Sequence, residues 1–363
     1  MANYENPRLV LDSSRPPEPG RVTWRSPSNI AIVKYWGKHS VQLPRNPSIS
    51  LTLTAACTDM TLEYALKEHP DPKIDLAFFF EDRPNEAFHS KVVAFLESIT
   101  PIFPFLRQLK LTLRTSNSFP HSTGIASSAS SMSALALCLC SLEHRFFQTL
   151  PDDDAFDRKA SYVARLGSGS ACRSIYPYAA LWGHTPAFPG SSDECAVSLE
   201  AQLHPVFKTF RDDVLVVSAA EKAVSSRAGH ALMEGNPFSE TRYTQARLRT
   251  AQLLEALRSG DVETFGQIAE GEALALHALM MCSQPPYLLL QPNTVAILHH
   301  VRAFRQETRL PVYFTLDAGP NVHLLYPAQH ADAVRPWVES ALKPLCENNF
   351  YLADSAGEGP EEL

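Results

Sequence analysis

The sequence contains no long apolar run, no excess of basic charge and no cysteine spacing typical of a disulfide framework or a zinc site. No run approaches the roughly 18 to 20 apolar residues that a membrane-spanning helix needs. Residues 1–28 contain no apolar core followed by a small-residue cleavage site, so we expect no signal peptide. The 32 basic residues against 39 acidic ones give a net charge of −7. This balance argues against nucleic acid or an anionic membrane as a partner, and an anionic ligand would need a local basic pocket.

The seven cysteines are an odd number and are spread along the chain. The nearest pair, Cys138 and Cys140, lies in an apolar helical segment, where positions two apart point to different faces. We therefore predict buried, free thiols in a reducing cytoplasm.

The chain of 363 residues exceeds the about 250 to 300 residues at which a single core stops growing, so we expect two domains. A β-rich first third precedes helical segments, and a new strand begins after residue 205. We therefore predict an α+β fold with domains at 1–205 and 206–363. Strands are expected at 22–33, 48–66, 110–116, 212–220, 310–319 and 321–327, a loop running into a helix at 119–146, and helices at 152–167, 241–260 and 262–281.

The segment PHSTGIASSASS, residues 120–131, combines glycine with serine and threonine before a long apolar helix. Free backbone N–H groups, hydroxyl donors and the positive end of a helix dipole suit a polyphosphate. The segment is neither a Walker A motif nor a dinucleotide-binding GxGxxG motif. Plain capping of the helix is the alternative interpretation.

Two further segments pair serine hydroxyls with an arginine: GSGSACRS at 167–174 and KAVSSRAGH at 222–230. Small residues let a ligand approach the backbone, and an arginine fork recognises carboxylate or phosphate with two hydrogen bonds. A glycine-rich turn with a surface arginine explains the first segment equally well. For the second segment, an ordinary solvated loop is the alternative interpretation.

The segment NIAIVKYWGK, residues 29–38, places two lysines after an apolar run, which is also consistent with an ordinary strand and turn. Asp317 follows an apolar strand and precedes an Ala-Gly-Pro turn. An aspartate there either stabilises the turn or serves as a base. The histidines lack paired spacings, so we expect packed or solvent-facing rings at His121, His184, His230, His277 and His323. Together, these hydroxyls, arginines, lysines and one aspartate favour phosphoryl transfer to a small anionic alcohol.

Seven blocks, from about residue 26 to about residue 327, resemble those of the diphosphomevalonate decarboxylase family of the GHMP kinase superfamily, in the same order: NIAIVKYWGK, LPRNPSISLTL, SFPHSTGIASSAS, GSGSACRS, VVSAAEKAVSSRAGH, EALALHALMM and YFTLDAGPN. The resemblance implies a first domain like ribosomal protein S5 domain 2, a ferredoxin-like second domain and an active site between them. It implies ATP-dependent decarboxylation of mevalonate 5-diphosphate to isopentenyl diphosphate in the mevalonate pathway, with ATP and Mg²⁺. A cytoplasmic homodimer is also expected.

The resemblance assigns roles to individual residues. Asp317 would orient or deprotonate the 3-hydroxyl, with Lys34 near the reacting centre, and Arg173 would bind the substrate carboxylate beside Asn29. Ser128 would also reach Mg²⁺. The substrate's diphosphate and body would contact Tyr35, Lys38, Ser168, Ser170, Ser226 and Arg227, and the ATP phosphates would contact Gly124, Ile125, Ala126, Ser127 and Ser128.

The chain departs from the family pattern at two places. WGKRD is replaced by WGKHS, with His39 and Ser40, and SSRxGM is replaced by SSRAGH, with His230. The second change adjoins the expected substrate pocket. Three alternatives therefore stay open: a decarboxylase of mevalonate 5-phosphate, a kinase that stops after 3-phosphorylation, and a non-catalytic sensor of nucleotide or isoprenoid precursor.

Overall fold

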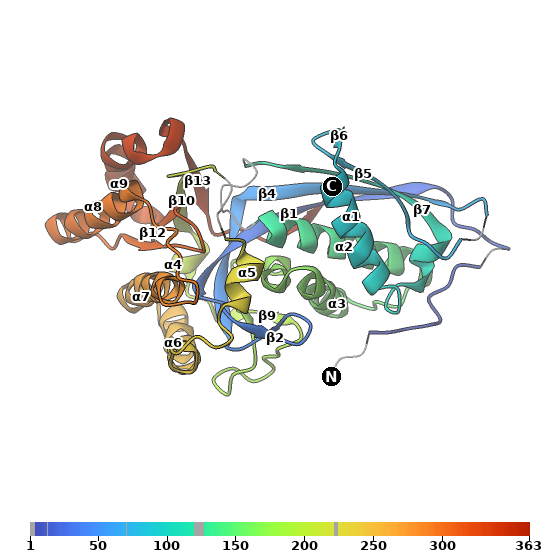
Figure 1. Ribbon diagram of the computed structural model, residues 1–363, viewed down its shortest axis with the longest axis horizontal. Helices are drawn as coiled ribbons and strands as arrows, with labels where there is room; N and C mark the ends of the chain where they lie inside the picture. The colour runs from blue at the N-terminus through green and yellow to red at the C-terminus, as the bar shows by residue number, and fades with distance from the viewer. Residues whose placement is uncertain (1–3, 13, 70, 120–126, 221–223) are drawn as a thin grey trace.

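The computed structural model describes residues 4–12, 14–69, 71–119, 127–220 and 224–363. Two mixed domains of helix and sheet lie side by side, so the α+β prediction is confirmed (Figure 1). None of the described helices is long and apolar enough to cross a membrane.

The first sheet is built around two long antiparallel strands, β1 (Gly20–Val33) and β4 (Ser48–Leu66). From residue 58 to residue 64, β4 alternates buried and half-buried side chains, because helices cover one face only. From 48 to 53 every residue is buried, because the second domain covers the other face. The order is β14-β1-β4-β7-β5-β6, with β8 on β4 and β9 on β8; the remaining strands are β5 (Asp75–Phe80), β6 (Arg83–Pro84), β7 (Leu109–Asn117), β8 (Ala179–Trp182), β9 (Ala196–Ser198) and β14 (Glu361–Glu362), and β2 (Lys38–His39) pairs with β3 (Leu43–Pro44).

The helices α2 (Ser127–Phe147) and α3 (Asp153–Gly167) pack under this sheet, as Figure 1 shows. The alanine-rich α2 is buried around most of its circumference, as an apolar helix without breakers predicts. Asp152 caps α3 by accepting a hydrogen bond from the Ala155 N–H. All seven cysteines are free, as predicted, and six of them are buried. The prediction of burial is wrong for Cys282, which is exposed just after the end of α7. The helix α1 (Glu86–Ser98) was not predicted.

The second sheet has the antiparallel order β11-β12-β10-β13. The predicted strand at 310–319 is shorter than expected, because β11 ends at Thr315 and Asp317 lies outside the sheet. The strands are β10 (Phe210–Leu215), β11 (Tyr313–Thr315), β12 (Val322–Pro327) and β13 (Tyr351–Ser355), and the helices are α4 (Pro205–Lys208), α5 (Ser226–Ala231), α6 (Ser239–Ser259), α7 (Val262–Met281), α8 (Pro292–Thr308) and α9 (Ala331–Trp337).

The two domains share one hydrophobic cluster at their junction. Ile30 and Ile49 of the first sheet belong to the same buried cluster as Phe210 and Phe265 of the second domain. The Asp354 carboxylate of β13 accepts backbone N–H groups from three consecutive residues of β4, Thr54 to Ala56. The last strand, β14, pairs with β1. The boundary at 205/206 therefore stays a prediction, because the end of the chain returns to the first sheet.

Buried Asp213 of β10 predicts a dependence of stability on pH. Its exposed fraction is 2%, its carboxylate accepts the Tyr326 hydroxyl, and burial raises its pKa from 3.8 to about 6. The folded state therefore binds more protons than the unfolded state between these values, and the free energy of unfolding falls as pH rises through that window. Asp213→Asn keeps the acceptor and removes the charge.

Relative to the wild type, we expect Asp213→Asn to gain about 3 kcal/mol in the free energy of unfolding between pH 4 and pH 7. Urea unfolding at several pH values measures this difference. A constant difference between the two proteins across that range would contradict the prediction.

Candidate active site

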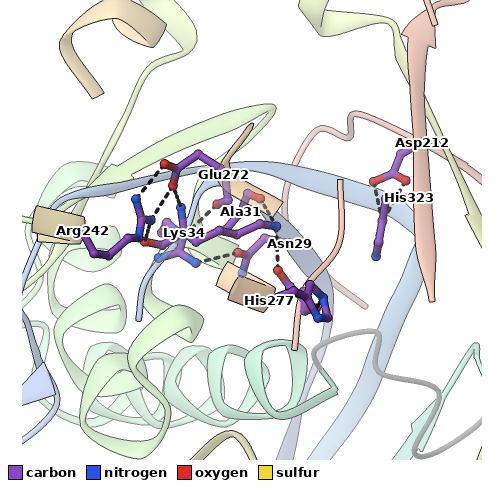
Figure 2. A network of polar contacts seen from close by, with 11 residues as sticks. Asn29, Ala31, Lys34, Asp212, Arg242, Glu272, His277 and His323 are labelled. Atoms are coloured by element: carbon purple, nitrogen blue, oxygen red, sulfur yellow. Dashed lines mark hydrogen bonds and ion pairs between the residues drawn. The ribbon is translucent and has the colours of Figure 1, made fainter. Parts of the chain in front are cut away.

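The end of β1 carries Lys34 into the junction between the domains. Its backbone is held from both sides: the N–H donates to Glu272 Oε2 at 2.8 Å, and the carbonyl accepts from Arg242 Nη2 at 3.2 Å (Figure 2). The Asn46 side-chain amide donates to the same carbonyl at 3.0 Å. Helices α6 and α7 of the second domain thus fix the position of a residue in the first.

Glu272 lies at the centre of this network. Its carboxylate is fully buried, and it accepts from both terminal nitrogens of Arg242 and from Arg249 Nη1 at 2.8 Å. Burial alone would raise the pKa of Glu272, but Arg242 and Arg249 outweigh it and hold that pKa below its usual range. Glu272 is therefore ionised and holds Lys34 through its backbone.

Lys34 and Asp317 form an ion pair, with 2.9 Å between Nζ and Oδ1. The side chain of Lys34 is 2% exposed and that of Asp317 is 31% exposed, so the carboxylate is the accessible member. His277 Nε2 lies 3.1 Å from the backbone carbonyl of Asp317, and the Gly319 N–H donates to the same carbonyl. The turn after β11 is thus held from two sides.

Arg173 is a buried cation whose direct partners are neutral. It lies on the 3₁₀ helix η2 (Gly169–Ile175) and donates to Ser48 Oγ at 2.7 Å, Ser50 Oγ at 2.9 Å and Asn29 Oδ1 at 3.3 Å. No carboxylate of the described residues lies within ion-pair distance of it. Burial lowers the pKa of Arg173, and the charge of Asp317 acts in the opposite direction. A buried guanidinium of this kind favours binding of an anion.

Asn29 links this arginine to the rest of the cluster. Its amide nitrogen donates to Ser174 Oγ at 2.8 Å and to the Ser170 carbonyl at 3.1 Å, so its oxygen is directed to Arg173. The structure therefore brings together the four residues that sequence reasoning assigned to the reacting centre: Asn29, Lys34, Arg173 and Asp317.

The turn after Lys34 carries Tyr35 and Lys38. The Tyr35 hydroxyl is buried and has no hydrogen-bond partner among the described residues, while its ring packs on Trp182 at 4.6 Å between centroids. Gly37 has a φ of +96°, a conformation that favours glycine, and an added Cβ would collide with the Tyr243 hydroxyl. The predicted turn at this glycine is thus confirmed.

Lys38 Nζ donates to Gln42 Oε1 at 3.0 Å. Burial lowers the pKa of Lys38, and the positive charge of Arg227 is a further cause. Ser226 begins α5 and is exposed, and Ser170 is half-buried.

Of the predicted ATP site, Gly124, Ile125 and Ala126 lie outside the described residues, and Ser127 is the first residue of α2. Ser128 is exposed, and its Oγ lies 3.3 Å from Ser168 Oγ at the end of α3. The first turn of α2 has no acidic residue that would repel a phosphate. The two serine-rich segments, 120–131 and 167–174, therefore approach each other at Ser128 and Ser168.

Sequence reasoning missed the residues that hold the site in place. One sequence signal pointed to Glu272, because it is a charged residue in the apolar helical segment EALALHALMM. Its partner Arg242 lies elsewhere in the sequence. The strand residues Ser48 and Ser50 gave a second signal, since they alternate with apolar neighbours and share one face of the strand.

As predicted, His277 and His323 are packed, the latter against Asp212 at 2.8 Å. In the described part of the chain, no three His, Cys, Asp or Glu side chains are grouped to hold a metal ion.

Replacing Glu272 by Gln tests the network. The variant keeps an acceptor for the Lys34 N–H but leaves Arg242 and Arg249 without their buried counter-charge, which typically costs about 3 to 5 kcal/mol. We expect a loss of that size in the free energy of unfolding, measured with urea at pH 7. The matched control is Glu255→Gln on α6, whose pair with Arg258 is exposed and should contribute under about 1 kcal/mol. Equal losses in the two variants would contradict the prediction.

Comparisons with known proteins cover both domains of the chain. Residues 26–194 match the diphosphomevalonate decarboxylase-like N-terminal domain, and residues 213–359 match the mevalonate 5-diphosphate decarboxylase C-terminal domain. The diphosphomevalonate decarboxylase of Candida albicans is 30% identical over 93% of this chain and 96% of its own length. The bovine protein of the same name is 29% identical over 83% of this chain and 75% of its own.

Solved structures give the same result. The mevalonate diphosphate decarboxylase of Staphylococcus aureus is similar with a TM-score of 0.80 and 27% identity, over 95% of this chain and 98% of that one. MDDEF in complex with MVAPP, AMPPCP and magnesium has a TM-score of 0.78 and 28% identity, over 94% and 98% of the two chains. With its fold, its two matched domains and its 30% identity to a relative over most of both chains, the chain belongs to the diphosphomevalonate decarboxylase family.

Proposed function

We propose that the protein catalyses ATP-dependent decarboxylation of mevalonate 5-diphosphate to isopentenyl diphosphate, with release of ADP, phosphate and carbon dioxide, in the mevalonate pathway of isoprenoid biosynthesis. The observation that carries this proposal is a buried arginine, Arg173, that has no carboxylate partner among the described residues and lies beside a lysine–aspartate pair. Arg173 is suited to bind a substrate carboxylate, and the Lys34–Asp317 pair is suited to a hydroxyl that must accept a phosphoryl group. Family membership agrees with both.

The first chemical task is to make the tertiary hydroxyl a leaving group. Asp317 is the accessible member of the ion pair, so its carboxylate would accept the hydroxyl proton as oxygen attacks the γ-phosphorus. Lys34 stabilises the ionised carboxylate at 2.9 Å and would offset negative charge on the transferred phosphoryl group.

The second task is to break the bond to the carboxylate. Arg173 is fixed by Ser48, Ser50 and Asn29, so its charge would hold the substrate carboxylate in one orientation. The carbon–carbon bond then supplies its electron pair to the new double bond as the 3-phosphate leaves. A preorganised cation needs no rearrangement during this step.

The remaining residues are suited to the phosphates. Lys38 and Arg227 supply positive charge for the diphosphate, and the Tyr35 hydroxyl, Ser168, Ser170 and Ser226 supply donors for the substrate. The amino end of α2, with Gly124 to Ala126, Ser127 and Ser128, would bind the ATP phosphates. Mg²⁺ would arrive with the triphosphate, bind the Ser128 hydroxyl and neutralise phosphate charge. A homodimer in the cytoplasm is proposed from the family alone.

The decisive assay measures labelled carbon dioxide from substrate labelled in its carboxylate. We expect release with mevalonate 5-diphosphate and ATP, and at least about tenfold lower kcat/KM with mevalonate 5-phosphate, because the distal phosphate would lose its contact with Lys38 and Arg227. Preference for the monophosphate would favour the phosphomevalonate decarboxylase alternative. ADP release without carbon dioxide would favour a 3-kinase, and no substrate-stimulated ATP turnover would favour a sensor.

Asp317→Asn tests the base. The amide keeps a hydrogen-bond acceptor but cannot take the proton, so we expect kcat to fall by about 10² to 10⁴, while the KM for ATP changes little. Steady-state and single-turnover kinetics measure the loss. Asp213→Asn is the matched control, because it makes the same substitution at a carboxylate that contacts Tyr326, and it should keep wild-type kcat. Retention of more than about a tenth of wild-type kcat by Asp317→Asn would remove Asp317 from the base role.

A further inference from the structure

His230 of α5 lies against the turn that follows Lys34. Its ring is 4.3 Å from the Tyr35 ring and 4.6 Å from the Trp36 ring, measured between centroids. Its Nδ1 accepts a hydrogen bond from the Gly37 N–H at 3.0 Å. Position 230 is also where the chain departs from the SSRxGM pattern of its family, and methionine has no comparable acceptor.

The hydrogen bond defines the protonation state of this histidine. An Nδ1 that accepts cannot carry a proton, so the neutral ring carries its proton on Nε2. Burial, with the charge of Lys38 as a further cause, lowers the pKa of His230 to about 3. Lys38 in β2 is the cation that acts on the ring among the described residues, and Arg227 on α5 acts in turn on Lys38. The imidazole is therefore neutral at working pH and acts as a fixed acceptor.

The contact joins two elements that carry predicted substrate ligands. The turn carries Lys38, and α5 carries Ser226 and Arg227. Among the residues that the structure describes, the bond from Gly37 to His230 is the hydrogen bond between them. Packing reinforces it, since a Cβ added at Gly229 would lie 2.5 Å from Trp36. Only this close approach lets the ring reach the turn.

Burial is the main cause that lowers the pKa of Lys38, and the positive charge of Arg227 is a further one. The two like charges repel each other, and a contact that fixes α5 against the turn opposes this repulsion. A site that holds two cations together before the ligand arrives binds a polyanion better, because the ligand does not have to bring them together.

We propose that His230 is a positioning residue that holds Lys38 and Arg227 together and thereby sets the affinity for the diphosphate end of the substrate. This inference rests on the proposed function and adds a residue to it.

Two variants separate the hydrogen bond from the stacking. His230→Phe keeps a ring between Tyr35 and Trp36 and removes the acceptor, whereas His230→Asn keeps an oxygen near Nδ1 and removes the ring. For His230→Phe we expect the KM for mevalonate 5-diphosphate to rise about 5- to 20-fold, with kcat within about threefold and the KM for ATP unchanged. His230→Asn should recover most of the affinity. With mevalonate 5-phosphate the effect of His230→Phe should be smaller.

Calorimetric binding of mevalonate 5-diphosphate without ATP gives a readout that does not depend on turnover. His184→Phe, at an exposed histidine after β8, is the control and should match the wild type. Wild-type affinity in His230→Phe overturns the inference. An equal rise in the KM for mevalonate 5-diphosphate and the KM for ATP, together with a lower thermal stability of the variant, also overturns it. A wild type that binds no mevalonate 5-diphosphate overturns the proposed function and the inference together, whereas normal wild-type turnover with an unchanged His230→Phe overturns the inference alone.

Discussion

The arrangement of the site depends on the buried carboxylate of Glu272. Two arginines neutralise it, and it in turn accepts the backbone N–H of Lys34. Arg242 donates a hydrogen bond to the Lys34 carbonyl. Because these hydrogen bonds engage the backbone of Lys34, its ammonium group stays available for Asp317. Helices of the second domain therefore position a lysine of the first without competing for its charge.

The reacting centre contains more positive than negative charge. Lys34 and Arg173 are both buried cations. The carboxylate of Asp317 forms an ion pair with Lys34. Burying an arginine without a carboxylate is costly, and hydroxyl and amide oxygens offset part of this cost. The folded protein therefore stores a preference for an anion at this place. The carboxylate of the proposed substrate would supply the missing counter-charge of Arg173, which would link the stability of the fold to the chemistry proposed for the site.

The sequence predicted the long strands β1 and β4, the strands β7 and β12 and the helices α2, α3, α6 and α7, because their apolar patterns are strong. The strands expected at 212–220 and 310–319 are shorter in the structure, where they end at Leu215 and Thr315. It also predicted which residues gather, through the resemblance of ordered blocks. It missed α1, where Val92 and Leu96 are the buried residues and the apolar pattern is weak. It missed the support of Arg173 by Ser48 and Ser50 because these contacts join residues more than 120 positions apart. Such pairings depend on which strand lies beside which, and that is a tertiary property.

The two parts of the site are held with unequal strength. The reacting centre is fixed by buried ion pairs and by strands covered on both faces. Among the residues that the structure describes, the turn that carries Lys38 is joined to α5 by the neutral hydrogen bond from Gly37 to His230 and by ring packing. Changes near Lys34 would therefore disturb the fold as well as the proposed chemistry, whereas a change at residue 230 would act on the contact between α5 and the turn and leave the reacting centre as it is.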